Sequence, residues 1–383
     1  MTSRERLHAA MTGNMPDKIP ISPRISVYLI DRFGDCNPKT ELKYAHEHDY
    51  DMHHHVSGPV PAIIEGATSD LPYTKNVKID IKTWQENEFT AVRRIFHTPS
   101  GVLSDTTMLP PKKPEYGVSP NPFKTEWLIK EKNDLDKMAY ILPEAEKCGS
   151  VKYYYDTDAI IGDNGITEMA IRGSIDKRAG DARGMDNLMM DYYDDREFFD
   201  AQINFFMKYV MDETKFCLEK DIKYIFGTWF YTSLSAGWSP KIFRECFIPQ
   251  MKMHVDLVHS YDAIYNLYDD GKMSLVLEDY ASTGTDVLQT LTPPPVGDVV
   301  LANVKKRIGD KVTLMGHMDL IYVMLLGTPD EVEKAVKDAI SIAGPGGRFI
   351  LGTTDSIREG TPEANMKAYF KTANKYRYYP LQL

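Results

Sequence analysis

The stretch that decides the fold is KVTLMGHMDLIYVMLLGTPDEVEKAVKDAISIAGPGGRFILG, residues 311–352. Its ends, 312–316 and 349–352, are short apolar runs of the length expected for buried strands. Between them, Thr328-Pro329-Asp330-Glu331 has the form of a capping box at a helix start, and apolar residues then recur at helical spacing until Gly344. The order strand, helix, strand indicates parallel strands joined by a crossover helix.

Similar apolar runs recur along the chain, with longer segments of helical periodicity between them. We expect strands at 18–23, 158–162, 167–173, 224–230, 263–268, 287–291, 312–316 and 349–352, and helices over 197–218 and 240–259. The alternation breaks between about 65 and 132, which indicates a hairpin-bearing insertion. No Pro/Gly/Ser-rich linker divides the chain. The sequence therefore predicts an α/β fold, a single (β/α)8 TIM barrel over residues 1–383 with that insertion.

Composition and charge exclude several classes of protein. The formal net charge of −10 argues against a nucleic-acid-binding surface. The four cysteines have no short-range pairing, which indicates isolated thiols in a reducing compartment. The N-terminus lacks the apolar run of a signal peptide, and no stretch has the roughly 18 apolar residues of a membrane span. We therefore expect a cytoplasmic protein without nucleic-acid or membrane partners, and a homodimer stays open.

Candidate site residues follow from one rule of TIM barrels, that the chemistry sits at the C-terminal ends of the strands. The rule selects Arg24, His55, Arg172, Trp229, Tyr231, Tyr268, Asp270, His317 and Asp355. Asp270 and Asp355 each follow a strand, where a carboxylate can bind a metal or act as an acid or base. Either could equally be a helix N-cap. His317 directly follows the strand at 312–316 and is a better catalytic candidate than a histidine inside a strand.

The run His53-His54-His55 invites a metal-site interpretation. Alternation along a strand sends His53 and His55 to one side and His54 to the other, so at most two of them share an ion. The alternative is a partly buried, hydrogen-bonded strand end.

Aromatic and basic side chains near the strand ends suggest how a substrate would be held. Trp229, Phe230 and Tyr231 could stack an aromatic ring, or could be packing in the core. Arg172 and Arg24 could hold a carboxylate or phenolate, or could pair with neighbouring acids.

Read in order, several segments resemble the uroporphyrinogen decarboxylase superfamily. They are Ser3–Leu7 with Pro16–Pro20, Thr98–Gly101, Gly184–Leu188, Ser239–Phe243 with Pro249, Thr292–Asp298, Leu314–Asp319 and Asp355–Asn365. The likeness covers nearly the whole chain, and the order of the segments carries it more than any single motif.

The resemblance implies a choice between two chemistries. The decarboxylases carry an arginine-rich N-terminal motif, whereas the corresponding strand here offers only Arg24. The corrinoid-dependent methyltransferase branch binds zinc through a His-x-Cys-Gly motif and a later cysteine. This chain has Tyr268-Asp269-Asp270-Gly271 at the first position and Asp355 at the second, so the thiolate ligands are absent. If a metal is bound, zinc included, its ligands are then expected to be oxygen or imidazole, drawn from Asp270, Asp355, His317 and His55.

From the resemblance we expect a methyltransferase component of an O-demethylase system. It would move a methyl group from a small-molecule O-methyl donor, an aromatic methyl ether, to the cobalt(I) of a corrinoid (cobalamin) carried by a partner corrinoid protein. The expected catalytic residues are Asp270, Asp355, Tyr268 and His317, and the expected substrate-binding residues are Trp229, Phe230, Tyr231, Arg172, Arg24 and His55. Alternatives are a decarboxylase or lyase acting on a small carboxylic acid, a methylcobamide:thiol methyltransferase, and a non-catalytic scaffold for a corrinoid protein.

Overall fold

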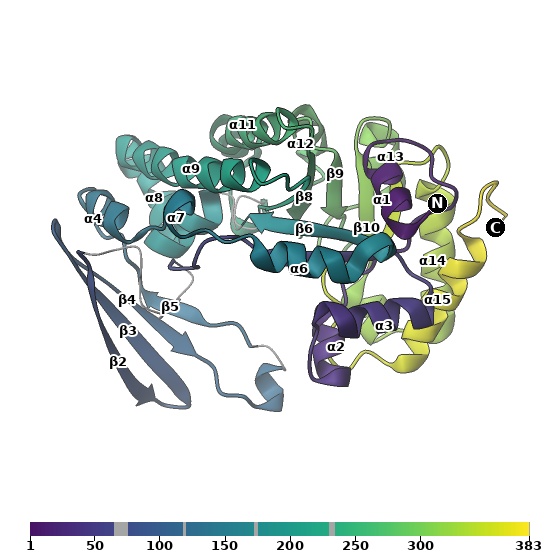
Figure 1. Ribbon diagram of the computed structural model, residues 1–383, viewed down its shortest axis with the longest axis horizontal. Helices are drawn as coiled ribbons and strands as arrows, with labels where there is room; N and C mark the ends of the chain where they lie inside the picture. The colour runs from purple at the N-terminus through teal and green to yellow at the C-terminus, as the bar shows by residue number, and fades with distance from the viewer. Residues whose placement is uncertain (65–75, 118–119, 172–174, 230–233, 383) are drawn as a thin grey trace. The chain divides into compact units, whose positions relative to one another are not determined.

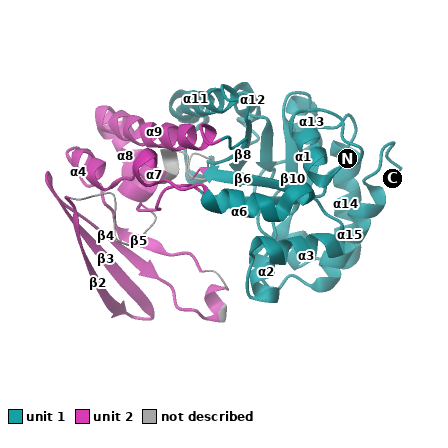
Figure 2. Ribbon diagram, in the orientation of Figure 1, with its two compact units in different colours: residues 1–57, 152–170, 221–383 teal, residues 58–151, 171–220 magenta. Residues whose placement is uncertain are grey.

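The computed structural model describes residues 1–64, 76–117, 120–171, 175–229 and 234–382 (Figure 1). The chain divides into two compact units (Figure 2): unit 1 holds residues 1–57, 152–170 and 221–383, and unit 2 holds residues 58–151 and 171–220. Among the described residues, no helix is both long enough and apolar enough to cross a membrane.

Unit 1 is built on a curled parallel sheet. Its seven strands lie in the order β1 (Met52–Ser57), β6 (Gly165–Ile171), β7 (Tyr224–Thr228), β8 (Ile264–Asp269), β9 (Val287–Thr290), β10 (Thr313–Met318) and β11 (Phe349–Thr353). An eighth extended segment, residues 20–22, lies between the edge strands β11 and β1. The N–H of Ser22 donates to the carbonyl of Leu351 in β11, and the N–H of Asp51, just before β1, donates to the carbonyl of Ile21. Eight extended segments thus form the ring of a TIM barrel, as the sequence predicts.

The N-terminal end of this ring is filled by an apolar layer. Ile166, Ile264, Val287, Met315 and Ile350 come from five strands and pack with Leu7, Ala10 and Met11 in a single buried cluster. The last three belong to helix α1 (Ser3–Met11), which begins with a capping box formed by Thr2 and Glu5. Because strand side chains repeat every two residues on one face, the next inward positions are Glu168, Asn266 and Gln289, all fully buried.

The remaining helices of unit 1 include those that join successive strands (Figure 1). They are α2 (Ser26–Phe33), α3 (Pro38–His48), α6 (Lys152–Ile161), α10 (Pro240–Ile242), α11 (Ile248–His259), α12 (Leu277–Ser282), α13 (Leu301–Ile308), α14 (Pro329–Ala343) and α15 (Glu363–Tyr376). The predicted capping box of α14 is confirmed, because the Thr328 hydroxyl accepts from the N–H of Glu331 and the Glu331 carboxylate accepts from the N–H of Thr328.

Unit 2 has a different architecture. Its antiparallel sheet has the order β2 (Lys78–Glu86), β3 (Phe89–Thr98), β4 (Gly101–Leu109) and β5 (Phe123–Glu126), all inside the insertion predicted at 65–132. Its helices are α4 (Asp134–Ile141), α5 (Ala145–Cys148), α7 (Ile175–Arg183), α8 (Met185–Asp194) and α9 (Arg196–Leu218).

One predicted strand is wrong. Residues 158–162 form the end of α6 and the turn after it. The apolar run Ala159-Ile160-Ile161 suggests a strand when it is considered alone, but the buried residues of α6 are Tyr154, Thr157 and Ile161, which follow the helical period. The helical spacing of the buried residues, and not the short apolar run, therefore indicates the secondary structure of this segment.

The ring closes on one buried carboxylate, Asp51. Its Oδ1 accepts from Arg6 of α1 at 2.5 Å, and its Oδ2 accepts from Arg377, after α15, at 2.5 Å. The same Oδ2 also accepts from the N–H of Ile21 at 3.0 Å. Asp51 is 1% exposed and Arg377 is 0% exposed, so removing the carboxylate would leave two cations without their buried partner.

We expect Asp51→Asn to destabilise the protein by about 3–5 kcal/mol, the usual cost of breaking a buried ion pair on one side. Urea denaturation would measure this. The matched control is Asp158→Asn, which breaks the pair with Arg4 whose side chains are 30% and 32% exposed; there the loss should stay below about 1 kcal/mol. Equal losses in the two variants would contradict the role of Asp51 in closing the ring.

Candidate active site

Four polar side chains meet at the C-terminal end of the barrel in unit 1. Tyr268 lies in β8, Asp270 directly follows it, Asp355 follows β11, and Arg24 follows the segment 20–22. Arg24 Nη1 donates to Asp355 Oδ1 at 2.8 Å, and its guanidinium carbon lies 4.8 Å from the centre of the Tyr268 ring. We call Arg24, Tyr268, Asp270 and Asp355 the mouth cluster.

The two neighbouring aspartates at the C-terminal end of β8, Asp269 and Asp270, have different roles. Asp269 is fully buried, and its carboxylate accepts from the N–H of Gly271 at 2.8 Å and from the hydroxyl of Tyr280. Asp269 therefore stabilises the turn. Asp270 is half-buried and borders a cavity of about 270 Å³ that Asp355 also lines, with Thr292, Asp319, Thr354 and Arg358. The structure thus places the two predicted carboxylates at one cavity.

The pKa of Asp270 is higher than that of an ordinary aspartate. Burial, and then the nearby carboxylate of Asp355, raise the pKa of Asp270 from 3.8 to about 6. Burial also raises the pKa of Tyr268 well above 10, so its hydroxyl keeps its proton. Asp355, which is 38% exposed, is held instead by the Arg24 cation. The cluster therefore combines a carboxyl poised to give a proton with an ion pair that supplies fixed charge.

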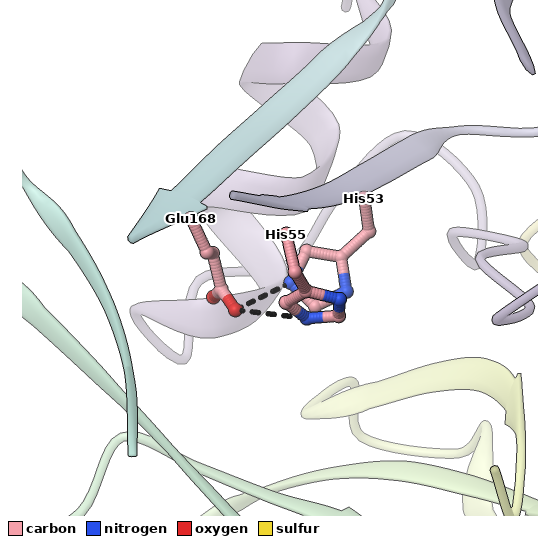
Figure 3. Close-up of side chains that lie close together, drawn as sticks. All are labelled: His53, His55 and Glu168. Carbon is pink, nitrogen blue, oxygen red and sulfur yellow. Dashed lines mark ion pairs between the residues drawn. The ribbon is translucent and has the colours of Figure 1, made fainter. Parts of the chain in front are cut away.

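Deeper in the barrel, His53 and His55 of β1 meet Glu168 of β6 (Figure 3). His53 Nε2 lies 2.8 Å from Glu168 Oε2, and His55 Nε2 lies 3.4 Å from the same oxygen. The two rings are nearly perpendicular, with centroids 4.5 Å apart. We call these three residues the histidine–glutamate cluster. As the alternation along the strand predicts, His54 points to the other side, where its Nδ1 lies 2.6 Å from Glu41 Oε2.

The charge states in this cluster follow from burial and proximity. Burial, and then the neighbouring His53 ring, lower the pKa of His55. Burial opposes ionisation of Glu168, but the two histidines outweigh it and lower the pKa of this carboxyl. Glu168 is therefore a carboxylate, and His55 a neutral imidazole, at pH 7. Asn266 Nδ2 in β8 donates to Glu168 Oε2 at 3.1 Å, which fixes the carboxylate from a third strand.

The other predicted site residues have separate environments. His317 Nδ1 lies 2.8 Å from the carbonyl of Leu291, and burial lowers the pKa of His317. The predicted metal-ligand set is Asp270, Asp355, His317 and His55. Among the described residues, His55 instead clusters with His53 and Glu168, and no cluster contains all four predicted ligands. Arg172, Phe230 and Tyr231 lie outside the described residues.

The predicted stacking role of Trp229 needs correction. Trp229 is 0% exposed, and its indole N–H donates to the hydroxyl of Tyr265 at 2.8 Å. The Tyr265 hydroxyl in turn lies 3.0 Å from Nδ1 of the buried His254 in α11. Trp229 is therefore part of the packing between the sheet and α11, because its position in the alternation sends it outward.

Sequence reasoning missed Glu168, Asn266 and Gln289. All three are polar residues at inward-facing positions of mainly apolar strands, and each lies two positions after a residue of the apolar layer, on the same face. Asn266 Nδ2 also donates to Gln289 Oε1 at 3.0 Å. The signal that could have found them is a charged or amide side chain at an inward position of a barrel strand, where burial is costly unless the group has a partner or a function.

Residues 177–376, slightly more than half of the chain, match the family model described as Uroporphyrinogen decarboxylase (URO-D). The chain belongs to the uroporphyrinogen decarboxylase family. Among curated relatives, a uroporphyrinogen decarboxylase of Hordeum vulgare is 31% identical over 156 residues, 40% of this chain and 43% of that protein. A uroporphyrinogen decarboxylase of Parasynechococcus marenigrum (strain WH8102) is 32% identical over 144 residues, 37% of this chain and 38% of that protein. The matches thus span about two fifths of each relative.

Among solved structures, a methyltransferase from Methanosarcina mazei superposes with a TM-score of 0.67 at 16% identity, over 98% of this chain and 99% of that one. This likeness shows that the fold extends through the whole length of this member of the uroporphyrinogen decarboxylase family. It agrees with the barrel predicted from the sequence.

The raised pKa of Asp270 predicts how stability changes with pH. The folded-state pKa of about 6 is above the usual 3.8, so the folded protein binds the proton more tightly than the unfolded chain. Stability from this group is therefore present below pH 3.8 and is lost as the pH rises through 6, by at most about 3 kcal/mol.

Asp270→Asn should remove this loss. We expect the unfolding free energy of the variant, relative to wild type, to rise between pH 4 and pH 7.5, as measured by urea denaturation at both values. Asp355→Asn should shrink the effect, because it removes the charge that helps to raise the pKa of Asp270. A difference between Asp270→Asn and wild type that does not change with pH would contradict a raised pKa.

Proposed function

We propose that this protein transfers a methyl group from an O-methyl substrate, an aromatic methyl ether, to the cobalt(I) of a corrinoid protein. Asp270 carries the proposal, because it is a half-buried carboxyl at the barrel mouth whose pKa is raised to about 6. The shared fold with the Methanosarcina mazei methyltransferase supports the reaction class. In this proposal the corrinoid is carried by the partner protein and is the acceptor substrate of the reaction.

The chemistry needs an acid because the leaving group is poor. The bond between the methyl carbon and the ether oxygen breaks, and the methyl carbon forms a new bond with the electron pair of the acceptor cobalt(I). The oxygen keeps the pair of the broken bond and takes the proton of Asp270, so a neutral phenol leaves instead of a phenoxide. A positioned general acid contributes typically about 100- to 10,000-fold to such a step.

The rest of the mouth cluster assists this acid. The Asp355 carboxylate disfavours loss of the proton from Asp270, and Arg24 holds Asp355 in place. A guanidinium has five N–H donors, so Arg24 can also steady an anionic group on the substrate ring. The proposed roles of Tyr268 and His317 in assisting the acid, and of Phe230, Tyr231 and Arg172 in holding the ring, remain predictions.

A thiolate zinc site of the kind expected from the methyltransferase branch does not fit this chain. The positions that would supply its ligands carry Tyr268, Asp270 and Asp355, which are oxygen donors. Cys217 and Cys246 belong to no disulfide and are buried, Cys217 in α9 and Cys246 in the π-helical turn before α11. Such a zinc therefore has no part in the proposed reaction, and methyl transfer to a thiol is a weaker candidate than methyl transfer from an O-methyl substrate.

Decarboxylation of a small carboxylic acid is the second candidate, because the family match and the curated relatives favour it. In that reaction the bond from carbon to carboxylate breaks, carbon dioxide leaves, and Asp270 would give its proton to the carbon. The two candidates differ in their products, since only one releases carbon dioxide and only the other methylates the corrinoid.

We expect Asp270→Asn to lower methyl transfer by about 100- to 10,000-fold. The assay follows the corrinoid spectrum as cobalt(I) is converted to methyl-cobalt(III), with a panel of methoxyarenes and a cognate corrinoid protein. Asp310→Asn is the matched control, because Asp310 is exposed in the turn before β10, on the opposite end of the barrel. The wild-type rate should fall about tenfold per pH unit above pH 6, as the acid form of Asp270 is lost.

Two outcomes would contradict the proposal. If Asp270→Asn transfers methyl at the wild-type rate from a confirmed donor, Asp270 is not the acid, and if Asp355→Asn does so as well, neither aspartate is. If no methoxyarene methylates the corrinoid but a small acid releases carbon dioxide, the protein is a decarboxylase.

A further inference from the structure

We infer that His53, His55 and Glu168 form a binding site for one divalent transition-metal ion of the zinc class. The inference goes beyond the proposed function and does not rest on it. The potential ligand atoms of the three side chains all lie within 4.8 Å of one another (Figure 3). They come from adjacent parallel strands, in which His55 is the register partner of Glu168.

The distances between these atoms are close to those of ligands that share an ion. Bonds of about 2.0–2.2 Å to a tetrahedral zinc place neighbouring ligand atoms roughly 3.3 Å apart. The two nitrogen-to-oxygen distances are 2.8 Å for His53 and 3.4 Å for His55. The potential ligand atoms of the three side chains are thus already close enough together for one ion to bind all three.

Three imidazole nitrogens of this cluster have no hydrogen-bond partner among the described residues. They are His53 Nδ1, His53 Nε2 and His55 Nε2, all buried. The two Nε2 atoms approach Glu168 Oε2 as ion pairs, without the geometry of hydrogen bonds. A buried polar atom without a partner is costly, and an ion removes the cost by taking the lone pairs of both rings. His54 shows the contrast, since its ring is satisfied by Glu41 on the other side of β1.

The surroundings also resemble those of a metal site. Asn266 donates to Glu168 and to Gln289, which orients the carboxylate as an outer-shell partner does. Two imidazoles and one carboxylate are a donor set that suits zinc and leaves a fourth position open. His53, His55 and Arg24 line a cavity of about 300 Å³. The ligand class that fits the fourth position is therefore water or an anionic oxygen, with Arg24 as the countercharge.

The experiment loads tag-free, chelator-treated protein with Zn²⁺, removes unbound metal and measures metal content by elemental analysis. We expect about one Zn²⁺ per wild-type chain and at least a tenfold loss in His53→Ala, His55→Ala and Glu168→Gln. His54→Ala is the matched control on the same strand, and the double variant Asp270→Asn/Asp355→Asn tests the mouth cluster. Both should keep the metal. Asn266→Ala should weaken affinity about 10- to 100-fold in a calorimetric titration.

Substitution by Co²⁺ gives a readout that needs no variant. The wild-type protein should show the intense visible bands of a four- or five-coordinate ion, without a thiolate charge-transfer band. Circular dichroism of each metal-free variant checks that it folds. Wild-type protein that retains no stoichiometric Zn²⁺ or Co²⁺ would overturn the inference, as would binding that is lost in the mouth-cluster variant but kept in folded His53→Ala and His55→Ala.

Discussion

Closure of the barrel in unit 1 depends on a single buried charge. Asp51 accepts from Arg6 near the start of the chain, from Arg377 near its end, and from the backbone of Ile21 between them. A buried carboxylate is stable only when its partners are all in place, so these contacts form together or not at all. The segment that carries Ile21 leads directly to Arg24. The geometry of the mouth cluster is therefore set, in part, at the opposite end of the barrel.

Above the apolar layer, the barrel interior changes from hydrocarbon to polar groups in two steps. The deeper step holds the histidine–glutamate cluster with Asn266 and Gln289. All of these residues are buried except His55, whose side chain is 15% exposed. The outer step is the mouth cluster, in which Asp355 remains 38% exposed. Arg24 belongs to both steps, because it pairs with Asp355 and lines the cavity that reaches His53 and His55. The barrel thus has one acidic group tuned at its entrance and a metal-type donor set beneath it.

The sequence predicts the barrel well because apolar runs and capping residues are local signals, as in 312–316 and at Thr328. It fails at 158–162, where a short apolar run is compatible with both periods. Of the site, Asp270 and Asp355 can be predicted from their places after strands. Glu168 cannot be, because its partners are 113 and 115 residues earlier in the chain and only strand pairing brings them together. Trp229 shows the converse error, since one step in the alternation turns a pocket residue into a packing residue.

Helix α1 determines where small molecules can enter and leave the barrel. Its residues Leu7, Ala10 and Met11 complete the apolar layer and close the N-terminal end of the strand ring. Among the described residues this layer closes the N-terminal end, so a small molecule bound inside the ring enters and leaves at the C-terminal ends of the strands. Substrate entry and product release then use the same opening, so a bound product prevents the next substrate from binding. In a site with a single opening, product release limits turnover whenever the chemical step is fast.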